Sequence, residues 1–531
     1  MKRINLKRIA AAVIAVSSFF AGVYGSTVPS AAEPDEYHDD WLHVNENAEI
    51  VDMYGNPVWL TGCNWFGYNV GSQVFDGVWS RNMHEMLTEI ADHGFNLLRV
   101  PMSTQLLLQW KNNEPDPATP KINEWTNPEL TVEGVVGGKV KYSFDVWNQA
   151  VEWCRELGIK IMIDIHSAET ASAGHQVSLW YTDKYSTEDW YEALEWLTDY
   201  YKDDDTLIAI DLKNEPHGKA DVPSQMAKWD DSKDPNNWKY AAECAAEKVL
   251  AINPNLLIMV EGIEVYPKEG YDWTAPAKDW TTNTEFYYGA WWGGNFRGAK
   301  ENPIDLGEHQ SQLVYSPHDY GPLVYEQSWF HEGFTQESIM EEYWYDNWFY
   351  LLEEKTAPLL MGEWGGFIDE QHDPDGANTK WLTCLRDLMI ENRIHHTFWC
   401  FNENSGDTGG LVYDNFGTWD EDKYALVKPA LWQDENGKFI SLDHKFAIGA
   451  NGISLSDYYS GEQPTLPSES IDKCVFSVIS PTRSPTLSLV SKVIIIPCLV
   501  SSPNAMMTFL HSKNSLASVF RSSEHLSMIF L

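Results

Sequence analysis

The chain has 531 residues, of which 43% are hydrophobic, so it can form one large domain with an extensive core plus an appendage. Its 78 acidic residues outnumber the 37 basic residues and give a formal charge of −41. Such a polyanion repels phosphate groups, which excludes nucleic acid and anionic membranes as favoured partners. The 25 tryptophans offer flat rings that can fill a core or pack against the C–H faces of sugars.

Residues 1–32 have the pattern of a secretory signal peptide. An apolar stretch at 9–24 follows four basic residues and precedes small residues at 30–32. We therefore expect cleavage near Ala32 and a secreted, extracellular protein. The apolar stretch is short for a membrane span, and no later stretch is long enough to cross a bilayer.

From residue 41 to about 461, apolar runs of strand length alternate with amphipathic helical patterns. Helices are expected at 80–93, 186–202, 237–252 and 378–392. Buried strands are expected at 58–67, 95–102, 159–166, 207–216, 256–262, 313–320, 359–366 and 395–402. Strands that alternate with helices pair in parallel, so eight such units predict a (β/α)₈ barrel. An open doubly wound sheet is the alternative, but the chain has no G-x-G-x-x-G or phosphate loop to favour it.

The functional residues of such a barrel lie at the C-terminal ends of its strands. Polar and aromatic residues occupy the last positions of most runs, namely Arg99, His166, Asn214, Glu215, His318, Tyr320, Glu363 and Trp399. Two of them are glutamates, although an unpaired buried carboxylate is energetically costly. A facing pair of this kind suits a reaction that needs one carboxylic acid and one carboxylate, and glycosidic-bond hydrolysis is the commonest such reaction.

Six motifs resemble those of glycoside hydrolase family five, and most closely those of its bacterial endo-β-1,4-glucanases. They are NWFG (64–67), LLRVP (97–101), NEPHG (214–218), SPHDY (316–320), FWCFN (398–402) and SGDTGG (405–410). The resemblance covers residues 41 to about 430 and implies a retaining barrel enzyme. It also implies an acid/base glutamate ending the fourth strand and a nucleophile ending the seventh. Counting the runs independently puts Glu215 on the fourth and Glu363 on the seventh.

The two glutamates need different surroundings. As general acid/base, Glu215 should have its pKa raised by burial and by the neighbouring negative charge. As nucleophile, Glu363 should stay ionised, with a bidentate pair from Arg99 and a hydroxyl from Tyr320. Asn214 is expected to bind the sugar 2-hydroxyl. The structural alternatives are a helix-start glutamate at 215 and an ordinary strand-end ion pair at 363.

His166 and His318 are expected to support the substrate. With two carboxylates they could also bind a metal, so a metal-dependent hydrolase is a rival interpretation. The chain has no H-x-H pair, no third carboxylate at ligand spacing and no C-x-x-C among its seven cysteines. We therefore predict neither metal nor cofactor, and we read residues 373–376 as a turn rather than a calcium site.

Aromatic side chains are expected to hold the sugars. Trp399 should floor the subsite where the bond breaks, and Trp65, Trp180 and Trp292 are candidate platforms for neighbouring sugars. For these three, core packing is an equal alternative. Asp407 is a candidate partner of a sugar hydroxyl, by resemblance alone.

The prediction is a secreted, monomeric, cofactor-independent retaining endo-β-1,4-glucanase whose catalytic domain spans 41–461 and whose partner is a β-glucan polysaccharide. The same machinery acting on mannan, xylan or mixed-linkage glucan is the nearest alternative. A catalytically inactive barrel that only binds glycan is disfavoured because both glutamates are present. Residues 462–531 begin as a Pro/Ser linker and have a single acidic residue after Lys473, so we expect a disordered tail of unknown role.

Overall fold

The computed structural model describes most of the chain from residue 40 to residue 460. The described ranges are 40–114, 120–219, 222–276, 285–460, 475–477 and 493–495. The predicted signal peptide lies outside them. Within the predicted tail, the described residues form an antiparallel pair of β15 (Val475–Ser477) and β16 (Val493–Ile495), in a unit separate from residues 1–462.

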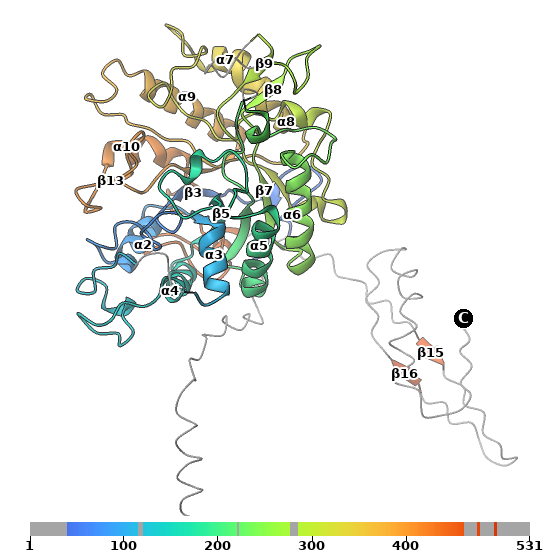
Figure 1. Cartoon of the computed structure of the whole chain (residues 1–531). Helices are drawn as coiled ribbons and strands as arrows, with labels where there is room; N and C mark the ends of the chain where they lie inside the picture. The colour runs from blue at the N-terminus through green and yellow to red at the C-terminus, as the bar shows by residue number, and fades with distance from the viewer. Residues whose placement is uncertain are drawn as a thin grey trace, which may run out of the picture. The chain divides into compact units, whose positions relative to one another are not determined.

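Eight parallel strands form a barrel in the order β10-β7-β6-β5-β4-β3-β12-β11 (Figure 1). Parallel bridges from Tyr315 to Leu359 and from His318 to Glu363 join the two ends of this order and close the barrel. The strands are β3 (Thr61–Asn64), β4 (Leu97–Ser103), β5 (Lys160–Ser167), β6 (Leu207–Asp211), β7 (Leu257–Val260), β10 (Leu313–Tyr315), β11 (Leu360–Met361) and β12 (His395–Phe398). Each lies within one predicted run or extends at most one residue beyond it, although several are shorter than the run, so the predicted (β/α)₈ barrel is confirmed.

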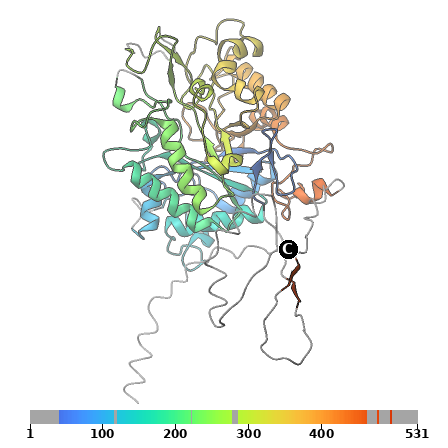
Figure 2. The ribbon, with the colours of Figure 1, turned by 90° about the vertical axis from the view of Figure 1, so that its right-hand side faces the viewer.

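Helices surround the strands, as the two views at right angles show (Figures 1 and 2). They are α2 (Met83–Asp92), α3 (Thr104–Lys111), α4 (Ser143–Glu156), α5 (Thr187–Tyr201), α6 (Trp238–Ile252), α9 (Ala377–Asn392), α10 (Glu421–Val427) and α11 (Leu455–Tyr459). The four predicted helices correspond to α2, α5, α6 and α9. Helix α5 begins with a capping box in which Ser186 and Asp189 satisfy each other's backbone N–H groups.

The connection from β10 to β11 is irregular. It consists of α7 (Gln336–Ile339), the π-helix η6 (Met340–Phe349) and α8 (Tyr350–Glu353). A π-helix of this length is rare, and no sequence pattern predicted it. Two-stranded pairs decorate the loops: β1 (His43–Val44) with β2 (Ile50–Val51), β8 (Val265–Pro267) with β9 (Tyr287–Gly289), and β13 (Val412–Tyr413) with β14 (Thr418–Trp419).

A buried ionic network ties both ends of this domain to the N-terminal end of the barrel. Lys160 opens β5, and its Nζ lies 2.8 Å from Asp40 Oδ2 and 3.0 Å from Asp443 Oδ2. His444 lies between two acids, with Nδ1 2.5 Å from Asp40 Oδ1 and Nε2 3.1 Å from Asp52 Oδ2. The segment after the last barrel strand is therefore anchored under the barrel by charge as well as by apolar packing.

The pH dependence of this anchor can be tested with His444→Gln. Burial lowers the pKa of His444, but its hydrogen bonds to Asp40 and Asp52 outweigh that effect and raise the pKa to about 9. A raised folded-state pKa stabilises the fold below the unfolded value of about 6.5, and this stability is lost as the pH rises through 9. The variant should therefore lose at most about 3 kcal/mol at pH 6 and progressively less towards pH 9, measured by urea unfolding. His309→Gln, on a surface turn, is the control; a His444→Gln deficit that stays constant with pH would contradict the prediction.

Candidate active site

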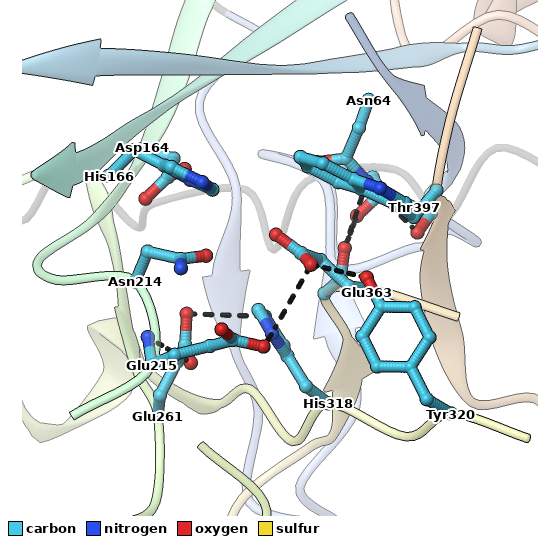
Figure 3. Close-up of polar contacts among 12 residues, drawn as sticks. Asn64, Asp164, His166, Asn214, Glu215, Glu261, His318, Tyr320, Glu363 and Thr397 are labelled. Carbon is cyan, nitrogen blue, oxygen red and sulfur yellow. Dashed lines mark hydrogen bonds and ion pairs between the residues drawn. The ribbon is translucent and has the colours of Figure 1, made fainter. Parts of the chain in front are cut away.

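Glu215 and Glu363 follow the C-terminal ends of β6 and β11, where the sequence places them. His318, which follows β10, lies between them, with Nδ1 3.1 Å from Glu215 Oε1 and 3.7 Å from Glu363 Oε2 (Figure 3). One carboxyl oxygen of Glu215, one carboxyl oxygen of Glu363 and one ring nitrogen of His318 all lie within 4.8 Å of one another. This separation fits a nucleophile and an acid/base, and is shorter than the gap that leaves room for a water molecule between two carboxylates.

Two donors hold the carboxylate of Glu363. Arg99 Nη1 donates to Oε1 at 2.8 Å, and the Tyr320 hydroxyl donates to Oε2 at 2.5 Å. Burial, followed by the neighbouring charges of Glu363 and Glu215, raises the pKa of Tyr320, so its hydroxyl stays protonated and donating. Both contacts fix the orientation of the Glu363 carboxyl group, as a nucleophile needs.

The guanidinium of Arg99 does not form the expected bidentate pair with Glu363. It donates a single N–H to Glu363. Its Nε and Nη2 instead both donate to Asp211 Oδ2, at 3.1 Å and 2.8 Å. Nη2 also lies 3.3 Å from both Asp164 Oδ1 and Glu261 Oε1. The fork faces Asp211 because Arg99, on β4, lies inside the barrel at the level of several strand-borne acids.

Sequence reasoning missed these buried acids and Asn64, whose Oδ1 accepts from Arg99 Nη1 at 3.0 Å. A signal was available, because Asp164 and Asp211 stand inside otherwise apolar strands where an unpaired charge is costly. A buried acid there needs a buried cation or several hydrogen-bond donors.

Glu215 differs from expectation in its acidity. Burial raises its pKa, but the hydrogen bond from His318 and the nearby histidine charges outweigh burial and lower the pKa below its ordinary value. The expected upward shift is therefore wrong for this free form, because the sequence did not reveal that His318 donates to Glu215. Burial lowers the pKa of His318, but Glu261, Glu363 and the hydrogen bonds raise it well above the ordinary value. His318 therefore carries the proton and donates it in a hydrogen bond to Glu215.

Asn214 and His166 flank the two glutamates. The Asn214 side-chain oxygen accepts from Arg99 Nη2 at 3.0 Å, and its amide nitrogen has no hydrogen-bond partner among the described residues. That nitrogen is buried and Asn214 does not line the cavity described below, so the expected contact with the sugar 2-hydroxyl stays a prediction. His166 Nδ1 lies 2.7 Å from Asp164 Oδ2, and burial lowers the pKa of His166 to about 3, so its ring is neutral.

The glutamates open into a cavity of about 940 Å³. Its lining includes Phe66, His166, Trp291, Trp292, Tyr320, Trp399 and Asp407. The Trp399 ring is nearly parallel to those of Phe66 and His166, with ring-centroid distances of 5.7 Å to each. Trp292 stacks on His217 at 3.7 Å. The cavity therefore has aromatic surfaces on more than one side of the two glutamates.

Two of the expected platforms are core residues. Trp65 is fully buried against Phe75 and Phe401, and its indole N–H donates to the Asp76 carbonyl. Trp180 is buried against Trp190 of α5 and Trp238 of α6. Neither lines the cavity.

Two clusters of described residues have metal-ligand spacing: Asp211 with Glu261 and His318, and Glu215 with His318 and Glu363. Arg99 already donates to a carboxylate in each cluster, to Asp211 and Glu261 in the first and to Glu363 in the second. A divalent cation would compete with this guanidinium, so the donor set fits an ion-pair network better than a metal.

A family model described as cellulase, glycosyl hydrolase family 5, matches residues 51–405, which is more than half of the chain. This protein belongs to glycosyl hydrolase family 5. Endoglucanase G of Acetivibrio thermocellus is 49% identical over 86% of this chain and 83% of its own length. The endoglucanase of Paenibacillus polymyxa is 33% identical over 80% of this chain and 95% of its own length. The endocellulase of Pyrococcus horikoshii has a TM-score of 0.62 at 30% identity, over 74% of this chain and 98% of its own.

Family membership makes the protein a glycoside hydrolase and confirms the predicted family. Among the described residues, none of the helices combines the length and hydropathy needed to cross a bilayer.

Arg99→Lys tests the network in this family 5 site. Lysine keeps the charge but loses the planar fork that reaches Asp211 and Glu363 together. We expect kcat on an aryl β-cellobioside to fall by about 100-fold, because the nucleophile loses its fixed orientation. Arg81→Lys, which alters a partly exposed pair with Glu89, should keep wild-type activity. Full turnover by Arg99→Lys would mean that Arg99 has only a structural role.

Proposed function

We propose that this protein is a secreted, retaining endo-β-1,4-glucanase in which Glu363 is the nucleophile and Glu215 the acid/base. The observation that carries the proposal is the pairing of two carboxylates within 4.8 Å that have unlike partners. Glu363 receives hydrogen bonds from Arg99 and Tyr320, whereas Glu215 accepts a hydrogen bond from His318. One carboxyl group is thereby held in place by two hydrogen-bond donors, and the other lies beside a histidine that can supply a proton.

The proposed reaction has two displacements. In the first, a Glu363 oxygen bonds to the anomeric carbon and the glycosidic C–O bond breaks. The leaving oxygen takes a proton from Glu215, which His318 supplies. In the second, Glu215 takes a proton from water as the water oxygen bonds to the anomeric carbon and the bond to Glu363 breaks. Two inversions give net retention.

The substrate class follows from the cavity and the relatives. Trp399 and Trp292 line the cavity and offer rings on which sugar faces can pack. The Pyrococcus horikoshii endocellulase has been solved in complex with cellotetraose. A relative from Xanthomonas campestris, 30% identical over 73% of this chain, is named a major extracellular endoglucanase. These support a β-glucan partner and secretion, and we propose that the enzyme acts as a monomer without a cofactor.

Reducing ends released from carboxymethyl-cellulose, mannan and xylan in parallel test the substrate. We expect hydrolysis of carboxymethyl-cellulose to exceed that of the other two by at least about tenfold, because hydroxyl contacts in the transition state discriminate between sugars. A falling viscosity that outpaces sugar release would indicate internal cleavage. Faster release of reducing ends from mannan or xylan would mean that the same catalytic residues act on that glycan instead. No release from any of the three would favour a protein that only binds glycan.

The two roles can be separated with paired variants. Glu363→Gly should abolish turnover on every substrate, because no covalent intermediate can form. Glu215→Gln should lose about 10²–10⁴-fold on glucans but much less on a dinitrophenyl glycoside, whose leaving group departs without protonation. Azide should rescue Glu215→Gly and yield the β-glycosyl azide, seen by proton NMR. An α-azide, or an identical response of both positions to leaving group and azide, would refute the assignment.

A further inference from the structure

Glu261 is a fully buried carboxyl just after β7 that lies outside the cavity lining, so substrate does not touch it. Its Oε2 accepts the backbone N–H of Glu215 at 2.8 Å. Its Oε1 lies 3.2 Å from His318 Nε2 and 3.3 Å from Arg99 Nη2. Building on the proposed function, we infer that Glu261 is a positioning residue for the acid/base: it fixes the backbone of Glu215 and orients the histidine that supplies its proton.

The backbone of Glu215 needs such support. Its φ is +50°, in the left-handed region, which is strained for a residue with a Cβ. Pro216 follows, and a residue before proline prefers an extended conformation with negative φ. The conformation is held from both sides, by Glu261 at the N–H and by His217 Nδ1, 2.6 Å from the carbonyl oxygen. Without the Glu261 carboxylate this N–H would be buried and unpaired.

His318 receives one carboxylate at each ring nitrogen. Nδ1 faces Glu215 and Nε2 faces Glu261. A carboxylate at Nε2 keeps a proton on that nitrogen, so the Nδ1 proton is the one exchanged with Glu215. An acid that orients a histidine, which in turn serves the reacting group, is the same division of labour as in hydrolase triads.

The loop above Glu261 confines the carboxylate. Gly293 has φ +73°, and its carbonyl accepts from the Gly262 N–H at 2.8 Å. A Cβ at position 293 would lie 2.2 Å from Glu261 Oε2. The loop that carries Trp292 into the cavity therefore fits only because residue 293 is glycine, and any larger residue would push the carboxylate away from the Glu215 N–H.

The test compares leaving groups. Glu261→Gln keeps the shape and removes the charge; we expect kcat/KM to fall about 100-fold on cellotetraose and less than about tenfold on 2,4-dinitrophenyl β-cellobioside. Gly293→Ala displaces the Glu261 carboxylate without removing it. Its kcat/KM should likewise fall more on cellotetraose than on the dinitrophenyl glycoside. Asp211→Asn is the matched control. It removes a buried acid that contacts Arg99 at 2.8 Å, and Arg99 holds the nucleophile. We therefore expect kcat/KM to fall by similar factors on both substrates.

Glu215→Gln measured beside them separates the two hypotheses. If Glu215→Gln shows no dependence on leaving group, the acid/base assignment itself fails, and this inference fails with it. Alternatively, kcat/KM of Glu215→Gln depends on the leaving group while kcat/KM of Glu261→Gln falls equally on both substrates. That result overturns only the role of Glu261. Thermal midpoints identify a folding defect, and if Glu261→Gln does not fold, the result for Gly293→Ala decides.

Discussion

One buried guanidinium allows four carboxyl groups to share the mouth of the barrel. Arg99 lies within 3.3 Å of Asp164, Asp211, Glu261 and Glu363, each from a different strand or strand end. Burial raises the pKa of Asp164 to about 7 and raises those of Asp211 and Glu261, even though Arg99 opposes these shifts. Removing the cation would leave several uncompensated buried charges, so the geometry of both glutamates depends on this one side chain.

The residues around Arg99 give the two glutamates, Glu215 and Glu363, different hydrogen-bond partners. Glu363 contacts Arg99 directly, whereas Glu215 does not contact Arg99 and is linked to it through Glu261, Asn214 and His318. The imidazole of His318 lies 0.6 Å nearer to Glu215 than to Glu363, at 3.1 Å against 3.7 Å. The asymmetry thus comes from partners rather than from burial, since both carboxyl groups are almost completely buried. This explains why a free form with a lowered Glu215 pKa still has a proton available: His318 carries it.

The parts predictable from sequence are those that repeat along the chain. Strand length, helical periodicity and the rule that strand ends carry function placed Glu215, Glu363 and His318 just after their strands, as the structure has them. Arg99 was expected at a strand end but is the third of the seven residues of β4, so its side chain lies deeper in the barrel. Contacts between strands were not predictable in this way, because each depends on a register that a single run does not reveal. Glu261 was read as the end of an apolar strand, and Trp65, one residue past β3, could not be assigned an inward or outward direction. The π-helix η6 likewise has no pattern of its own.

Strand β5 links the two ionic networks of the barrel. Residues 160, 162, 164 and 166 share one face, so Lys160 points into the lower network while Asp164 and His166 belong to the catalytic one. Between them Met162 packs in an apolar layer with Leu97, Ala209, Leu257, Met259, Val314 and Leu360. That layer keeps water and charge at one end from reaching the other. Because the catalytic cluster is closed off from below in this way, its electrostatics are set by Arg99, His318 and their carboxylates, and substitutions in the lower network should change stability without changing the acid/base pair.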